Sequence, residues 1–179
     1  MAEAFSNSLT RAVGVVTTYS GSTVGIASTA ITVTAATGIG VSDLVDNINF
    51  IAGTRVHSIV GTKVYVDRES SNTASAASQF VNFLGVTTAY TSASGTKSIL
   101  IGGTFANNTT SQVNLTVEIF DQSSDSTVGI AQKIPVPSGS SFVISDAGKS
   151  VLESLDEVRV YTDTAGAIDV NLSILTGVS

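Results

Sequence analysis

The sequence predicts an all-β protein: an antiparallel, jelly-roll-like β-sandwich that carries a small, inserted, β-barrel-like module. The first observation is composition, because 42% of the 179 residues are hydrophobic and only 12% are charged, with 16 Gly and 2 Pro. β-Branched residues mixed with turn-forming residues are typical of many short strands. The second observation is that apolar and polar residues alternate along several segments, as half-buried strands require. The low share of charged residues also favours a surface that other proteins partly cover.

The most regular alternation lies in residues 98–120, which read as two strands around the polar turn Ala106–Ser111. The residues expected on one face of these strands are Ile99, Ile101, Gly103 and Phe105, then Val113, Leu115, Val117 and Ile119. We expect the two strands to form a hairpin, and Leu115 and Val117 to lie in the core. A lone hairpin is marginally stable, so its apolar face needs a cover. The terminal strand expected over residues 168–175 alternates in the same way and is predicted to supply it.

The N-terminal half contains further strand signals separated by Gly, Ser and Thr. The strands expected there are, in chain order, 5–18, 31–33, 56–60, 63–67 and 80–84. Gly61 and Thr62 favour a hairpin between the third and fourth of these strands. A polar run of low complexity, Glu69–Ser78, precedes the last one.

Two similar heptapeptides indicate how the chain is divided. Residues 13–19 read VGVVTTY and residues 84–90 read LGVTTAY, so the chain returns to a similar strand about seventy positions later. The repeat predicts that residues 20–84 are a module inserted into a parent sandwich of residues 1–19 and 85–179. The ends of such an insertion lie close together at an exposed turn. The alternative is a chance likeness in a chain rich in Thr, Val and Gly.

The C-terminal half reads as short strands and turns. Pro135 and Pro137 lie in the strand expected over residues 130–137, and because proline lacks the N–H that a ladder needs, this is an edge strand. Residues 151–156 fit either a short helical stripe or a strand followed by a turn, and we favour the strand and turn. The other strands expected here cover residues 142–144 and 158–161.

Charge and composition exclude several functions. The eight Lys and Arg are scattered singly and the net charge is −6, so the basic cluster that nucleic-acid binding needs is missing. With no cysteine in the chain, disulfides and thiolate metal sites are excluded. The start of the chain does not resemble a signal peptide, and no apolar run approaches ~18 residues, so we expect neither secretion nor membrane insertion.

No motif predicts catalysis, and we assign no catalytic, cofactor-binding or metal-binding residue. His57 is the only histidine and is expected to be an ordinary strand residue. Asp121, Ser123 and Asp125 begin like a calcium loop, but Ser126 and Gln132 stand where such a loop needs glycine and glutamate. Paired carboxylates can hydrolyse glycosides, but the chain has no tryptophan to bind sugars. The sequence therefore predicts a structural or binding protein and not an enzyme.

Long runs of the chain resemble small virion structural proteins of tailed bacteriophages, particularly those of cyanophages and other marine phages with contractile tails. The runs that carry this resemblance are 5–14 (FSNSLTRAVG), 87–120, 133–144 (KIPVPSGSSFVI), 149–161 (KSVLESLDEVRVY) and 170–175 (VNLSIL). Residues 29–47 and 54–73 resemble small β repeats of phage tail and fibre proteins. The resemblance implies a non-catalytic particle component, present in symmetric copies, and it supplies no functional residues.

The leading hypothesis is a capsid decoration or cement protein that is a homo-oligomer and binds the major capsid protein. It would be located in the virion, which is assembled in the host cytoplasm. A polar arm, residues 1–12, is expected to pair with a neighbour's strand. One alternative is a neck, collar or tail accessory protein that binds other neck or tail proteins. A second is an adhesin that binds host-surface carbohydrate through Tyr65, Tyr90 or Tyr161.

Overall fold

The computed structural model describes residues 3–145 and 149–178, which contain strands and turns and no helix. These residues divide into two units: one is formed by Met1–Gly14 and Thr87–Ser179, and the other by Val15–Val86. The prediction places residues 15–19 and 85–86 in the sandwich. They belong to the module, because β2 (Val15–Val24) pairs with β7 (Ala76–Gly85) from Val15 onward.

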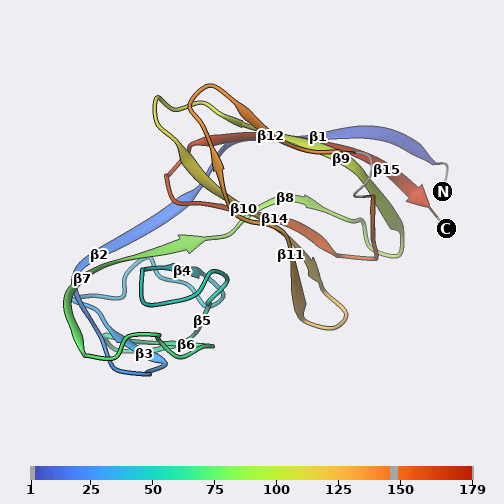
Figure 1. The fold of residues 1–179 in the computed structure, drawn as a ribbon. Coiled ribbons are helices and arrows are strands. Elements are labelled where there is room, and N and C mark those ends of the chain that lie inside the picture. Colours follow the sequence, from blue (N-terminus) through green and yellow to red (C-terminus); the bar gives the residue numbers. More distant parts are fainter. Residues whose placement is uncertain (1–2, 146–148, 179) are drawn as a thin grey trace. The chain divides into compact units, whose positions relative to one another are not determined.

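The first unit is a sandwich of two antiparallel sheets (Figure 1). Its strands are β1 (Ala4–Val13), β8 (Thr87–Thr91), β9 (Lys97–Asn107), β10 (Val113–Asp121), β11 (Ser126–Val136), β12 (Ser141–Ile144), β13 (Ser150–Leu152), β14 (Glu157–Thr162) and β15 (Ile168–Val178). One sheet has the order β1-β15-β9-β12, with β13 also paired to β9, and the other has the order β11-β10-β14-β8. We call them the five-stranded and the four-stranded sheet.

This order is that of a jelly roll. If β13 is treated as a continuation of β12, the unit has eight strands, which we count along the chain. The order β1-β15-β9-β12 of the five-stranded sheet then corresponds to its first, eighth, third and sixth strands. The four-stranded sheet contains the fifth, fourth, seventh and second strands. Two Greek keys wrapped into a double sheet produce this arrangement. The predicted all-β sandwich of jelly-roll type is therefore confirmed.

The core of the jelly roll lies between the inner faces of the two sheets. Leu115 and Val117 of β10 are fully buried, as predicted, and face Leu100, Leu172 and their neighbours in one apolar cluster. The rings of Phe105 and Phe142 pack in the same layer with centroids 6.0 Å apart and an interplanar angle of 41°. Burial of these alternating side chains is the main source of stability for such a sandwich.

The predicted hairpin over residues 98–120 is wrong. β9 pairs with β12, β13 and β15, whereas β10 pairs with β11 and β14, so the two strands belong to opposite sheets. The link Asn108–Gln112 crosses from one sheet to the other. Likewise β15 does not cover the apolar face of β9, because it is the neighbour of β9 in the same sheet.

The predicted strands of the C-terminal half agree with the structure. β11 is the edge of the four-stranded sheet and contains Pro135. Residues 151–156 form the end of β13 and a turn, not a helix. The segment 5–18, expected to be one strand, is instead two, because Gly14 separates β1 from β2.

The second unit is one six-stranded sheet with its own core. Its remaining strands are β3 (Ala30–Thr32), β4 (Leu44–Asp46), β5 (Val56–Val60) and β6 (Lys63–Val66), and the sheet order is β4-β7-β2-β3-β6-β5. The predicted hairpin around Gly61 and Thr62 is present as β5 and β6. The module is not a closed barrel: β4 is joined to the segment at the start of β5 by one isolated bridge, Leu44 to Arg55, and a few backbone hydrogen bonds.

Candidate interaction surface

The residues considered for chemistry are dispersed. His57 lies exposed on β5. Within residues 3–145 and 149–178, no group of three or more His, Cys, Asp or Glu side chains is arranged to hold a metal ion.

The loop that begins like a calcium site is organised as a turn. One carboxylate oxygen of Asp121 accepts hydrogen bonds from the backbone N–H of Ser123 at 2.8 Å, from the hydroxyl of Ser123 at 2.7 Å and from the N–H of Ser124 at 3.1 Å. These bonds from Ser123 and Ser124 lower the pKa of Asp121 from its ordinary value. The carboxylate therefore stabilises the β10–β11 turn, which is the usual role of aspartate in such turns.

The tyrosines proposed for sugar binding are not presented as a platform. Tyr161 is completely buried. The hydroxyl of Tyr90 lies 2.8 Å from the hydroxyl of Ser98, and its ring packs on the jelly-roll core, while Tyr65 is half-buried on β6. The strongly exposed aromatic residues of the described chain are instead Phe5 and Phe80.

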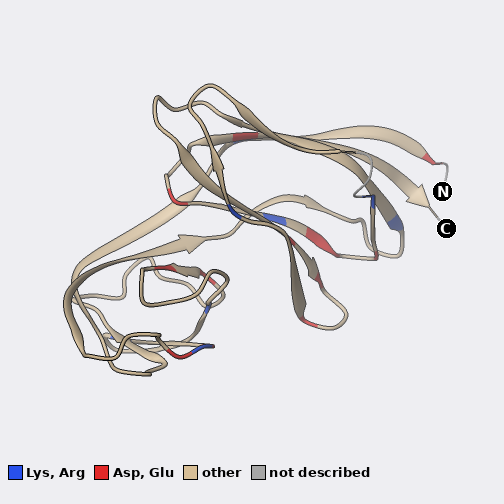
Figure 2. Cartoon of the chain, in the orientation of Figure 1, with Lys and Arg blue, Asp and Glu red and all other residues tan. Residues whose placement is uncertain are grey.

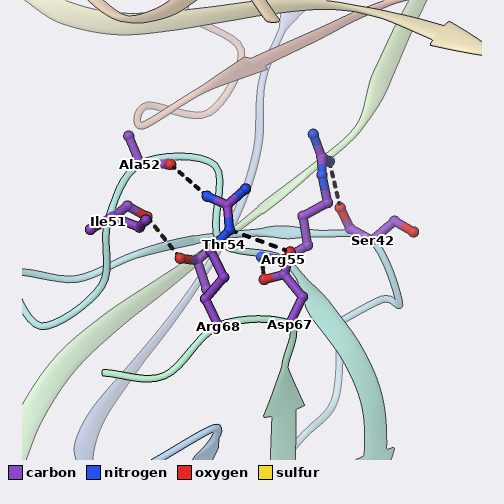
Figure 3. Close-up of polar contacts among 7 residues, drawn as sticks. All are labelled: Ser42, Ile51, Ala52, Thr54, Arg55, Asp67 and Arg68. Carbon is purple, nitrogen blue, oxygen red and sulfur yellow. Dashed lines mark hydrogen bonds and ion pairs between the residues drawn. The ribbon is translucent and has the colours of Figure 1, made fainter. Parts of the chain in front are cut away.

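Charged residues are spread over the chain without a long run of one sign (Figure 2). Two arginines of the module have structural partners (Figure 3). Arg55 donates from its guanidinium to the carbonyl of Ser42 at 3.3 Å, and Arg68 donates to the carbonyl of Ala52 at 3.2 Å. The backbone N–H of Arg55 also donates to Asp67 at 2.7 Å. These side chains fix the loop before β5 against the end of β6.

The most distinctive surface is the outer face of the five-stranded sheet. One row of directly opposed residues crosses four strands and consists of Phe5, Leu175, Ile99 and Val151. A second row consists of Leu9, Asn171, Thr104 and Val143. Directly opposed residues share one face of a sheet. We call the surface formed by these two rows the outer sheet face.

The outer sheet face is open to solvent and uncharged; its first row is apolar, its second row is half polar, and the polar Asn7 and Ser173 lie between them. Phe5 is 79% exposed, Leu9 72%, Val151 57% and Val143 54%. All eight side chains of its two rows are uncharged, and the pair Arg11–Asp169 lies beyond the second row with 3.9 Å between its charged atoms. Single exposed apolar residues are ordinary on protein surfaces, whereas several of them gathered on one uncharged sheet face indicate an interaction site.

A shallow hollow on this face lies beside Leu9. It is lined in part by Thr104, Ala106 and Asn171, whose short side chains leave room between β1 and the neighbouring strands. A second hollow lies beside Phe5, next to Ser173. Hollows beside large apolar side chains let a partner's side chain interlock with the sheet, which is how interface anchors are seated.

Sequence reasoning missed this face. The sequence predicts residues 1–12 to be a polar arm free to pair with a neighbour, but β1 pairs with β15 of the same chain over Ala4–Thr10. The available signal was the spacing of Phe5 and Leu9 among polar residues, which is a strand alternation.

Comparisons with protein-family models, with curated proteins and with solved structures produced no match. Among the described residues no helix has the length and apolar character needed to cross a membrane.

Proposed function

We propose that the chain is a non-enzymatic structural protein of a bacteriophage particle, a decoration protein that binds the head lattice through the outer sheet face. The observation that carries this proposal is the uncharged outer sheet face, on which Phe5 and Leu9 are more than two-thirds exposed on either side of the polar Asn7. The jelly roll already has a complete core between its sheets, so this second apolar surface is not needed for folding. Exposed apolar surface of this extent is maintained where a partner covers it.

The chemistry of the face indicates the kind of partner. With no charged side chain in either row, a partner does not need to supply compensating charge, and an uncharged surface with apolar side chains that enter the two hollows fits best. A capsid lattice made of many copies of one major capsid protein offers such a surface repeatedly. The likeness of residues 87–120 and 133–144 to phage virion proteins supports the same setting.

The decisive experiment is quantitative mass spectrometry of purified phage particles, with this chain counted against the major capsid protein. Hundreds of copies per particle support decoration of the head. A handful to a few dozen copies overturn the head assignment and favour the neck or tail. Absence from the particle overturns the whole proposal.

A binding assay with particles that lack the chain tests the surface itself. Val143→Asp places a charge in the second row of the outer sheet face and is expected to reduce binding at least ~10-fold, because a buried unpaired charge is strongly unfavourable. The matched control is Val128→Asp on β11, in the four-stranded sheet, where the side chain is 67% exposed. Equal binding by both variants would rule out the outer sheet face as the contact.

A further inference from the structure

The free edge of β1 is a long unprotected strand edge. β1 ends the five-stranded sheet, with β15 as its one paired neighbour among the described strands, and its register is regular from Ala4 to Thr10. Proteins protect such edges with proline, lysine or a bulge, and residues 4–10 contain none of these. The irregularity of β1 comes only after Thr10.

We propose that this edge pairs with the same edge of a second copy of the chain, antiparallel, about a two-fold axis at Asn7. In this register Asn7 faces Asn7 of the second copy, Phe5 faces Leu9, and Glu3 faces Arg11. The two five-stranded sheets thereby become one continuous sheet, and the two outer sheet faces become one surface. Because a two-fold contact uses the same surface of both copies, the Phe5–Leu9 and Glu3–Arg11 pairs each occur twice in the dimer.

The sequence selects this register over its neighbours. A shift by one residue would place the outward Phe5 opposite an inward side chain, because successive side chains alternate between faces. A shift by two residues would place Phe5 opposite Asn7 or opposite Arg11. Only the proposed register joins the two large apolar residues of β1 and, at the same time, the acidic residue at one end with the basic residue at the other.

The side chains involved are accessible for these contacts. Phe5 and Leu9 are 79% and 72% exposed, and Glu3 is exposed. The guanidinium of Arg11 lies 3.9 Å from Asp169 while its side chain is 91% exposed. Because a guanidinium carries five N–H donors, Arg11 can keep Asp169 and also bind Glu3 of the second copy.

The inward side chains of β1 bond to the opposite sheet and not across the free backbone edge of the strand. The hydroxyl of Ser8 donates to the carbonyl of Ala89 at 2.8 Å, and that of Thr10 donates to the same carbonyl at 3.5 Å. These bonds are made on the core side and tie β1 to β8 of the other sheet. These hydrogen bonds hold β1 in place and do not cover its outer backbone edge.

Cysteine cross-linking of the purified chain tests the register and does not depend on the virion proposal. The chain has no cysteine, so each variant carries one thiol. Under mild oxidation Asn7→Cys is expected to form a disulfide-linked dimer at least ~10-fold faster than Asn171→Cys, an exposed control on β15 of the same face. Phe5→Cys mixed with Leu9→Cys is expected to give the mixed dimer in preference to either self-linked dimer. Equal rates for Asn7→Cys and Asn171→Cys would overturn the proposal.

Charge reversal tests the same register without a covalent bond. Glu3→Arg and Arg11→Glu each replace two attractive contacts by two repulsive ones, and sedimentation equilibrium should show the dimer weakened by about 10-fold in each case. The double variant restores opposite charges between the two copies, although position 11 then carries an acid beside Asp169, and is expected to dimerise more strongly than either single variant. A double variant as weak as the single variants would overturn the Glu3–Arg11 pairing.

Discussion

The carbonyl oxygen of Gly14 accepts a 3.1 Å hydrogen bond from the backbone N–H of Gly166. This bond fixes the end of β1 to the β14–β15 turn at the point where the chain leaves the jelly roll. Gly14 has a φ of 128°, and a Cβ placed on it would lie 2.5 Å from the carbonyl oxygen of Thr164 and closer still to the hydroxyl of Thr162. Both the backbone conformation and the space therefore require glycine.

Gly14→Ala is expected to destabilise the jelly roll by roughly 3 kcal/mol or more, because it combines a strained φ with a collision against backbone. The control is Gly139→Ala, which also has a positive φ, 66°, but has open space around the added methyl group. The control should lose only about 1 kcal/mol, since it bears the conformational strain alone. Urea unfolding of both variants measures the difference, and equal losses would contradict the proposed collision.

The individual strands could be predicted from the sequence because half-burial is a local property. The predicted alternation marks β9 and β10 whatever their partners are. The face predicted for β9 is wrong in its first half, because a register shift near Gly102 puts Ile99 on the outer sheet face while Leu100 and Phe105 are buried. The pairing of β9 and β10 could not be predicted in the same way, because a two-residue period says nothing about which strands are neighbours. The hairpin prediction failed for this reason: β9 and β10 both contribute side chains to one core, but from opposite sheets.

The outer sheet face could not be predicted because alternation defines two faces without showing which one is inside. In β1 the large residues Phe5 and Leu9 point to solvent, and the small Ser8 and Thr10 point inward. The usual rule that apolar residues face the core would instead put Phe5 and Leu9 inside and Ser8 and Thr10 in solvent. The inward hydroxyls bond to the carbonyl of Ala89, a long-range contact that no local pattern reveals.

Leu115→Ala is expected to destabilise the jelly roll by ~2 to 4 kcal/mol, because the removed atoms leave a cavity in a fully buried layer. Val128→Ala is the control, since this side chain on β11 is 67% exposed and should change the free energy of unfolding by less than about 0.5 kcal/mol. Thermal unfolding provides the measurement. An unchanged midpoint for Leu115→Ala would show that the core does not lie between these two sheets.

Arg159→Ala is expected to destabilise the four-stranded sheet by about 1 to 2 kcal/mol. The guanidinium carbon lies 3.6 Å from the centroid of the Phe120 ring, and Nε lies 2.7 Å from a carboxylate oxygen of Glu157. Both charged side chains are less than a quarter exposed, which strengthens the ring contact and the ion pair relative to water.

The control for this prediction is Lys97→Ala. Lys97 and Glu153 form an ion pair of 3.0 Å, but their side chains are 50% and 61% exposed, so solvent screens the pair. The control should lose less than about 0.5 kcal/mol. If the two variants lost the same free energy of unfolding, the ring contact and burial of Arg159 would contribute nothing.

Asp43 is expected to make the stability of the module dependent on pH. Its side chain is 8% exposed, and burial raises its pKa above the ordinary value of 3.8, opposed in part by the 2.7 Å hydrogen bond from the N–H of Gly40. The folded chain thus binds this proton more tightly than the unfolded chain. The Asp43 contribution to the free energy of unfolding therefore increases as the pH falls through the folded-state pKa towards 3.8.

Asp43→Asn removes the buried charge and keeps an oxygen that can accept the hydrogen bond of Gly40. We expect the variant to be more stable than the original chain at pH ~7, where the carboxylate is charged in both states, and the difference to shrink towards pH ~4. Hydrogen exchange of the module amides at both pH values measures this difference in the free energy of unfolding. Asp125→Asn, an exposed carboxylate in the β10–β11 turn, serves as the control and should have little effect. A stability difference for Asp43→Asn that grows as the pH falls would reverse the sign argued here and show that the charged form is the one the module favours.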